Sequence, residues 1–229
     1  MRGPLLRREG RRSPKAVAKD VRQAIEVEQA TRRSLQYFVV PLWIATGLAD
    51  WYSHRRTHIE TTAGARESAL HSLMMVEAGI PATLGLFLDV NAGVLLAAFA
   101  GFVAHELTTI QDIAYAEDRR EVTDTEQHIH SFLEVTPLLA VSFLAVLHWD
   151  QALALVGRGR GKPDFRLRPK SRPLSRRYIV GLLASIGAFV ALPYAEEFWR
   201  CYRANPTLAA QPEAKEAPTG AARVPAGER

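Results

Sequence analysis

Five apolar stretches divide this chain, and they limit its fold more strongly than any other feature. The last of them, residues 178–195, offers 18 residues without a charge, close to the roughly 20 that a helix needs to cross a bilayer. The others are shorter or interrupted, so they reach that length only if the polar residues at one end continue the same helix. The five stretches are residues 34–49, 68–88, 91–104, 131–149 and 178–195.

A polar stripe is missing from the helices expected over 92–104, 135–147 and 178–195, which show almost no polar residue on any face. A surface helix of a soluble protein keeps one polar side. The pattern therefore predicts an all-α, integral-membrane helical bundle in contact with membrane lipid. A soluble bundle with unusually apolar core helices is the alternative, because apolar stretches of about 10 to 14 residues often have that origin.

Lysine and arginine gather in two regions that four expected spans separate, so both regions lie on the same side of the membrane. Ten of these residues precede residue 35, and nine more lie within 150–177. Cytoplasmic loops carry the excess of lysine and arginine. We therefore expect a cytoplasmic N terminus, in an inner membrane of bacterial type. The loops on the opposite side carry only Arg55, Arg56, Arg66, Arg119 and Arg120.

The chain divides into three parts by composition. Residues 1–33 are basic and polar and are expected to form a cytoplasmic segment, and residues 34–199 hold the membrane bundle. Residues 200–229 contain Pro, Ala, Gly and charged residues with little to bury, which predicts a disordered tail.

Composition also excludes some sites and partners. Cys201 is the only cysteine, which excludes an internal disulfide and a zinc site built from several thiolates. The net charge of +5 does not indicate nucleic acid, because the basic residues flank apolar segments instead of alternating with aromatic residues. No nucleic-acid partner is expected.

Histidines and acidic residues recur at helical spacing at one end of the first four apolar stretches. Residues four or seven apart lie on one face of a helix. The first and third stretches end, and the second and fourth begin, on the same side of the membrane, so the four groups reach one depth. The groups are Asp50, His54 and His58; Glu67 and His71; His105 and Asp112; and Glu126, His130 and Glu134.

These ten side chains are candidate metal ligands. Ionisable groups in or beside hydrocarbon are unfavourable unless they pair or serve a function. Imidazole with carboxylate is a ligand set of iron, manganese or zinc, and helical bundles build di-iron centres from Glu and His on facing helices. Ten candidates exceed the need of one ion, so we expect two metal ions with further carboxylates supporting the ligands.

Several of these residues also have a simpler explanation. Asp50 could face lipid headgroups, and Glu67 could interact with the dipole at a helix start. His54 and His58 could extend to the interface beside the neighbouring arginines. The metal hypothesis is favoured because four helices collect histidine and acid at the same end.

Three further residues are candidates for substrate contact or for supporting the ligands. Glu77 lies inside the second apolar stretch, and Arg119 lies in a charged loop where it could meet an anionic lipid headgroup. His128 is displaced by about 160° from His130 around a helix. We therefore expect His130 to face the bundle and His128 to face away.

The HxxxH spacing of His54 and His58, with further histidines at span ends, resembles the integral-membrane histidine-box di-iron hydroxylases and desaturases. The resemblance covers residues 50–134. It implies two iron ions, a lipid-like substrate and an electron donor. The expected function is thus that of a membrane-bound di-iron oxidoreductase, such as a hydroxylase, desaturase or oxygenase.

Two other functions are compatible with the same residues. A zinc hydrolase of membrane lipids needs three ligands, an open position for water and a carboxylate that acts as base. A non-enzymatic metal-binding or transport protein needs, for transport, polar groups that continue across the bilayer. Beyond Glu77, the cytoplasmic halves of the expected spans have few such groups.

Overall fold

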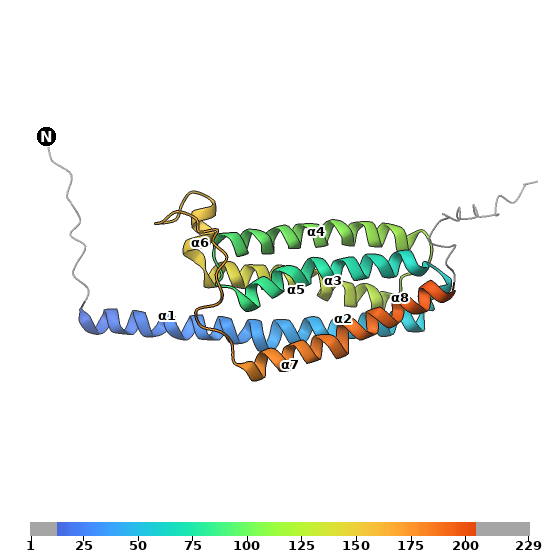
Figure 1. Ribbon diagram of the computed structural model, residues 1–229, viewed down its shortest axis with the longest axis horizontal. Coiled ribbons are helices and arrows are strands. Elements are labelled where there is room, and N and C mark those ends of the chain that lie inside the picture. Colours follow the sequence, from blue (N-terminus) through green and yellow to red (C-terminus); the bar gives the residue numbers. More distant parts are fainter. Residues whose placement is uncertain (1–12, 205–229) are drawn as a thin grey trace, which may run out of the picture.

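The computed structural model describes residues 13–204, which are almost entirely helical (Figure 1). The described residues form no strand, only an isolated bridge between Leu88 and Pro169. The predicted all-α class is confirmed. The α-helices are α1 (Pro14–Ser34), α2 (Val40–Arg56), α3 (Gly64–Phe87), α4 (Ala92–Glu117), α5 (Asp124–Leu147), α6 (Trp149–Leu155), α7 (Arg176–Ile186) and α8 (Leu192–Ala204).

Short π-helical turns join two pairs of these helices into continuous rods. The turn Leu35–Val39 joins α1 to α2, and the turn Gly187–Ala191 joins α7 to α8. Backbone hydrogen bonds in a π turn reach one residue further than in an α-helix, so the turn shifts the faces that follow it. The two rods run over Pro14–Arg56 and Arg176–Ala204.

Four helices begin at a side chain that caps them. Ser13, Asn91, Thr123 and Ser175 each accept a hydrogen bond from the backbone N–H three residues later, at the starts of α1, α4, α5 and α7. Such a cap satisfies one of the N–H groups that a helix start leaves unpaired. These polar residues therefore set where the connections end and the helices begin.

Four helical segments in the described part of the chain are long and apolar enough to cross a membrane: α3, α4, α5 and the rod Arg176–Ala204. At most 28% of the apolar window of any of them is buried inside the protein. Their outward apolar side chains fit a surrounding of lipid tails. The expected first span, residues 34–49, lies within the rod Pro14–Arg56 and is not one of the four.

The helices lie side by side, and α1 extends beyond the bundle at one end (Figure 1). That end, here called the α6 end, also holds α6 and the connection 88–91 between α3 and α4. The opposite end, here called the α8 end, holds the connections 57–63 and 118–123 and the C-terminal end of α8. Short connections at the two ends join α2 to α3, α3 to α4 and α4 to α5, so these helices run antiparallel in turn.

The basic segment between α6 and α7 packs across the α6 end of α3 and α4. The N–H of Asp89 donates to the carbonyl oxygen of Arg168 at 2.9 Å, and the N–H of Lys170 donates to that of Phe87 at 2.8 Å. The ammonium group of Lys170 donates to the carbonyl oxygen of Gly85 at 2.6 Å, near the end of α3. A cation is favourable there because the C-terminal end of a helix is partially negative.

The bundle ends later than its sequence suggests. The expected boundary at residue 200 is wrong, because α8 continues to Ala204 and Cys201 is completely buried. Cys201 belongs to a hydrophobic cluster with Ile59 and Tyr115, so this last turn is part of the core. Residues 205–229, the remainder of the expected tail, lie outside the described residues.

Candidate metal centre

Buried ionisable side chains meet near the α8 end of the bundle. They come from the last turns of α2 and α4 and the first turns of α3 and α5, so the expected meeting of these helix ends is confirmed. α8 contributes in addition. Seven residues, each at most 3% exposed, form the centre of this acidic cluster: Asp50, His54, Glu67, His71, Asp112, Glu126 and Glu197.

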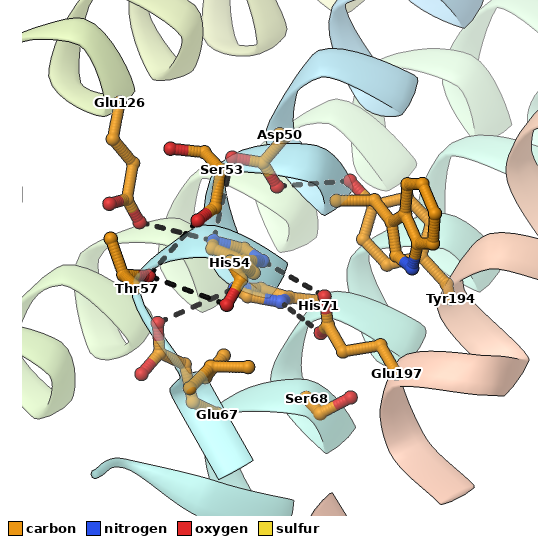
Figure 2. A network of polar contacts seen from close by, with 12 residues as sticks. Asp50, Ser53, His54, Thr57, Glu67, Ser68, His71, Glu126, Tyr194 and Glu197 are labelled. Atoms are coloured by element: carbon orange, nitrogen blue, oxygen red, sulfur yellow. Dashed lines mark hydrogen bonds and ion pairs between the residues drawn. The ribbon is translucent and has the colours of Figure 1, made fainter. Parts of the chain in front are cut away.

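Glu197 of α8 orients two histidines of the acidic cluster (Figure 2). Its Oε2 lies 3.0 Å from Nδ1 of His54, and its Oε1 lies 3.1 Å from Nδ1 of His71. The two imidazole rings are stacked, with centroids 4.6 Å apart and planes inclined by 8°. An ionised carboxylate only accepts hydrogen bonds, so both Nδ1 atoms donate. Nε2 of each neutral ring is then an acceptor.

Both Nε2 atoms face carboxylates. Nε2 of His54 lies 3.1 Å from Oε1 of Glu126 and 3.5 Å from Oδ1 of Asp50. Nε2 of His71 lies 3.2 Å from Oδ2 of Asp112. Acceptors facing acceptors require a cation between them, either a proton or a metal ion. Nε2 of His54, Oδ1 of Asp50 and Oδ1 of Asp112 are buried and have no hydrogen-bond partner among the described residues.

His130 of α5 extends the acidic cluster on the side of Asp50. Its Nε2 lies 3.0 Å from Oδ1 of Asp50, and its side chain is 17% exposed. The other oxygen of Asp50, Oδ2, accepts a hydrogen bond from the hydroxyl of Tyr194 on α8 at 3.0 Å. Tyr194 thus holds Asp50 from one side, while Oδ1 of the same carboxylate points toward two imidazoles.

Arg120, in the connection between α4 and α5, supplies a positive charge to the acidic cluster. Its side chain is 3% exposed. Its guanidinium donates to Glu67 (Nη2 to Oε1, 2.5 Å) and to Glu126 (Nη1 to Oε2, 3.0 Å). Burial lowers the pKa of Arg120, but the hydrogen bonds to Glu126 and Glu67 raise this pKa more, so it lies above its ordinary value. The charged guanidinium ties the start of α3 to the start of α5.

The charges of the acidic cluster do not balance without further cations. Its five buried carboxylates face one guanidinium, which leaves four negative charges while the imidazoles are neutral. Buried charges are strongly unfavourable unless they are paired or coordinate a metal. Two divalent cations would cancel all four charges. Protonation of the three imidazoles, those of His54, His71 and His130, would cancel only three.

Two groups of side chains in the acidic cluster could hold a metal ion: Asp50, His54, Glu126 and His130 form the first, and His54, Glu67 and His71 form the second. One ligand atom from each residue lies within 4.8 Å of the others in its group. Ligands about 2.1 Å from a tetrahedral ion lie about 3.4 Å from one another. Several pairs already have this separation, such as Nε2 of His54 and Oε1 of Glu126 at 3.1 Å, so only the widest pairs would have to approach, by up to about 1.4 Å. His54 belongs to both groups, but its Nε2 can bind only one ion. Asp112, beside His71, can replace it as a ligand of the second ion.

His58 lies outside the acidic cluster, and the expectation that it continues the ligand face of α2 is wrong. The helix ends at Arg56, and His58 has a left-handed backbone conformation (φ 53°) before the turn Ile59–Thr61. Its side chain is 73% exposed, and its Nδ1 lies 3.3 Å from Oε1 of Glu60. A four-residue spacing shares a face only while the helix continues.

A cavity of about 40 Å³ lies beside the acidic cluster. Two predicted ligands, His105 and Glu134, border it but belong to neither of the two groups that could hold an ion. Nδ1 of His105 lies 3.4 Å from the carbonyl oxygen of Met74. The cavity has room for about one water molecule. On one side the cavity is lined by Asp50, His71, Asp112 and His130. Its other lining residues are mainly apolar and include Trp43, Met74, Met75, Ile113 and Leu133.

Two of the residues expected to support the ligands lie away from the acidic cluster. Oε1 of Glu77 accepts a hydrogen bond from the hydroxyl of Thr108 at 2.8 Å, where α3 and α4 meet. The guanidinium of Arg119 lies over the ring of Tyr115, with Cζ 3.7 Å from the ring centroid. Arg119 therefore stabilises the end of α4.

His128 and His130 face different surroundings, as their spacing predicts. His128 is exposed and meets the ring of Phe132 edge-on, with centroids 5.3 Å apart. His130 points toward Asp50. The expected contrast within this helix is confirmed.

Spacing in the sequence does not reveal Glu197, Tyr194 or Arg120. The expectation of four helices that carry the site and a separate fifth helix is therefore too narrow, because the rod Arg176–Ala204 supplies two of these residues. A usable signal was present: this rod ends on the same side as the histidine groups, so a carboxylate just beyond residue 195 reaches their depth. For Arg120, the only signal in the sequence is that it lies in one of the two loops on the side of the membrane that has few arginines.

Comparisons with models of known protein families, with curated proteins and with solved structures find no match for this chain. The resemblance to the histidine-box enzymes stays a prediction.

Proposed function

We propose that this chain is an integral-membrane dinuclear metal protein, a di-iron oxidoreductase that uses dioxygen on a lipid-like substrate. The observation that carries the proposal is the orientation of His54 and His71. Glu197 accepts from both Nδ1 atoms, and both Nε2 atoms face carboxylates across a space that requires cations. A carboxylate behind a metal-binding histidine sets its tautomer and increases its basicity.

The ligand set and its charge favour two ions of iron or manganese. Imidazole and carboxylate donors without sulfur suit iron, manganese or zinc. Helical bundles that hold two irons take Glu and His from facing helices in the same way. Four uncompensated negative charges match two divalent ions better than a single zinc ion.

Bound iron would supply the reduction of dioxygen. For a hydroxylation, one dioxygen, two electrons and two protons insert one oxygen atom into a C–H bond and release the other as water. The electrons require a separate electron donor. The chain itself would hold the ions, shield them from bulk water and admit a small molecule through the cavity, whose apolar wall includes Trp43, Met74 and Leu133. A lipid-like substrate fits the apolar exterior of the surrounding helices.

A zinc hydrolase of membrane lipids is the second candidate. The cavity beside His130 has the volume of about one water molecule, and Glu134 lines it. In this candidate Glu134 would act as the base. This candidate predicts one zinc ion and a hydrolysis that needs no reductant.

Metal analysis of detergent-purified protein tests the proposal, with Glu197→Gln compared with Glu196→Gln. Glu196 is the adjacent residue, but its carboxylate accepts hydrogen bonds from Trp51 (3.0 Å) and Arg55 (2.8 Å), outside the acidic cluster. We expect about two iron or manganese ions in the wild type and in Glu196→Gln. Glu197→Gln should bind metal about 10 to 100 times more weakly, because the amide no longer accepts from both imidazoles.

Unchanged metal affinity of Glu197→Gln would contradict the proposed centre, as would a wild-type protein that takes up no transition metal. One zinc ion with hydrolysis independent of reductant would replace the oxidoreductase by the second candidate. Optical spectra of the oxidised and reduced protein distinguish iron from manganese.

A further inference from the structure

A second concave surface lies on the outside of the bundle, between the rods Pro14–Arg56 and Arg176–Ala204. It is a groove of about 540 Å³, within the range of about 300–1,000 Å³ typical of small-molecule sites. None of its lining residues belongs to the acidic cluster. Val40, Ile44 and Leu48 line one wall, and Leu182 and Phe189 line the other.

The groove exists because the two rods touch at its ends and stay apart between them. At the α6 end, the hydroxyl of Tyr178 donates to the carbonyl oxygen of Gln36 at 3.3 Å. At the other end of the groove, toward the middle of the bundle, the π turn Gly187–Ala191 packs against α2, and its Val190 is only 3% exposed. Between these contacts lie Gly181 and Ser185. A Cβ added at Gly181 would meet nothing within 4 Å, so the space beside it is open.

The groove is cationic at its α6 end, and the rest of it is lined mainly by apolar side chains. Arg177 lines the α6 end, and its guanidinium has no hydrogen bond or ion pair with any residue in the described range 13–204. The thirteen residues from Gln36 to Leu48 span twelve helical steps, which is about 18 Å of helix. That is more than half of the hydrocarbon thickness of about 30 Å. An acyl chain whose head group lies at the interface would extend along such a groove.

We propose that the groove binds one phospholipid with an anionic head group, with the phosphate at Arg177 and an acyl chain that extends toward Leu48 and Phe189. Guanidinium groups bind phosphate through paired hydrogen bonds. The basic segment 150–177 belongs to the same end of the bundle and attracts anionic lipid. A second copy of the chain fits less well, because a two-fold axis along the membrane normal would place one Arg177 against the other at equal depth.

The lipid would connect two rods that otherwise meet at few points. α7 has no buried residue of its own. An acyl chain in the groove would therefore supply apolar contact to α7 on one side and to α2 on the other.

Native mass spectrometry of the full chain, titrated with phosphatidylglycerol or with phosphatidylcholine of the same acyl chains, tests the proposal. Arg177→Gln removes the phosphate contact. Gly181→Leu places a side chain in the groove at a position where an added Cβ meets nothing within 4 Å. Arg158→Gln is the control in the same basic segment. Gly79→Leu is the control for a leucine at an open helical glycine.

We expect the wild type and both controls to retain one phosphatidylglycerol in preference to phosphatidylcholine. Arg177→Gln should bind phosphatidylglycerol about tenfold more weakly, for a loss of one charge-assisted contact, and should lose the preference. Gly181→Leu should lose both lipids. The metal content of both groove variants should equal that of the wild type, so failure of this proposal is distinguishable from failure of the metal centre.

Equal phosphatidylglycerol binding by the wild type, Arg177→Gln and Gly181→Leu would overturn the proposal. An effect of Arg158→Gln as large as that of Arg177→Gln would also overturn it, because binding would then follow overall charge. A lipid-free dimer that Gly181→Leu dissociates would assign the groove to a second copy of the chain.

Discussion

Two adjacent glutamates show how the surroundings of a single residue decide its role. Glu196 is partly exposed and holds Trp51 and Arg55 on the outside of the bundle, whereas Glu197 is completely buried and orients two imidazoles. Their chemistry is the same, and their depth is nearly the same. Successive residues of a helix are rotated by about 100°, so only the direction of the side chain separates them.

The same distinction in α5 leads to a prediction for His130 and His128. His130→Ala removes an imidazole 3.0 Å from Asp50, so it should reduce the metal content from about two ions to about one. His128→Ala removes an exposed side chain and should leave the metal content unchanged. Metal analysis of both variants, together with their thermal unfolding, measures the difference apart from any loss of folding. Metal loss in His128→Ala alone would require a different ligand set.

α3 and α4 pack closely against each other at Gly101. A Cβ added at Gly101 of α4 would lie 2.9 Å from the carbonyl oxygen of Glu77 and 2.9 Å from Cγ of Pro81. Proline has no N–H, so Pro81 leaves the carbonyl oxygen of Glu77 without its usual helical donor. The absence of a side chain at Gly101 lets α4 approach this carbonyl group. This approach fixes the distance between the helices that carry His71 and Asp112.

Gly101→Ala should therefore destabilise the bundle. The added methyl group has to push α3 and α4 apart, which is expected to lower the free energy of unfolding by about 1–3 kcal/mol. Gly79→Ala is the control, because a Cβ there meets nothing within 4 Å and alanine favours the helix by up to about 1 kcal/mol. Thermal unfolding in detergent measures both variants. An unfolding temperature of Gly101→Ala at or above that of the control would show that the helices separate without strain.

The whole molecule has two chemically different ends. The α6 end carries the basic segment 150–177, and the α8 end carries the acidic cluster with the buried Arg120. Positive charge marks the cytoplasmic side of a membrane protein. We therefore expect the acidic cluster to lie near the side of the membrane opposite to the cytoplasm.

Cysteine labelling in intact cells tests this orientation. Glu121→Cys places an exposed thiol in the connection at the α8 end and should react with a membrane-impermeant maleimide added outside. Arg158→Cys, in the basic segment, should react only after the membrane is permeabilised. The unsubstituted chain is the control, because its Cys201 is buried. Protection of Glu121→Cys with labelling of Arg158→Cys would reverse the orientation and place the metal site beside the cytoplasm.

The sequence by itself determined the helical class, the depth at which histidines and acids meet, and the contrast between His128 and His130. Each of these follows from the period of a helix and from the length of apolar stretches, which are properties of a single segment. His54, His71 and Glu126 could be assigned to one site for this reason, since neighbouring spans run in alternate directions.

Only the tertiary structure decided which side chains meet. His58 leaves the ligand face because the chain turns after Arg56. Glu197 enters the acidic cluster because the rod Arg176–Ala204 is rotated with that face inward, and Arg120 enters it because the loop 118–123 folds over two carboxylates. The rotation of one helix against another and the path of a loop depend on contacts between distant segments, and the periodicity of a single segment contains no information about them.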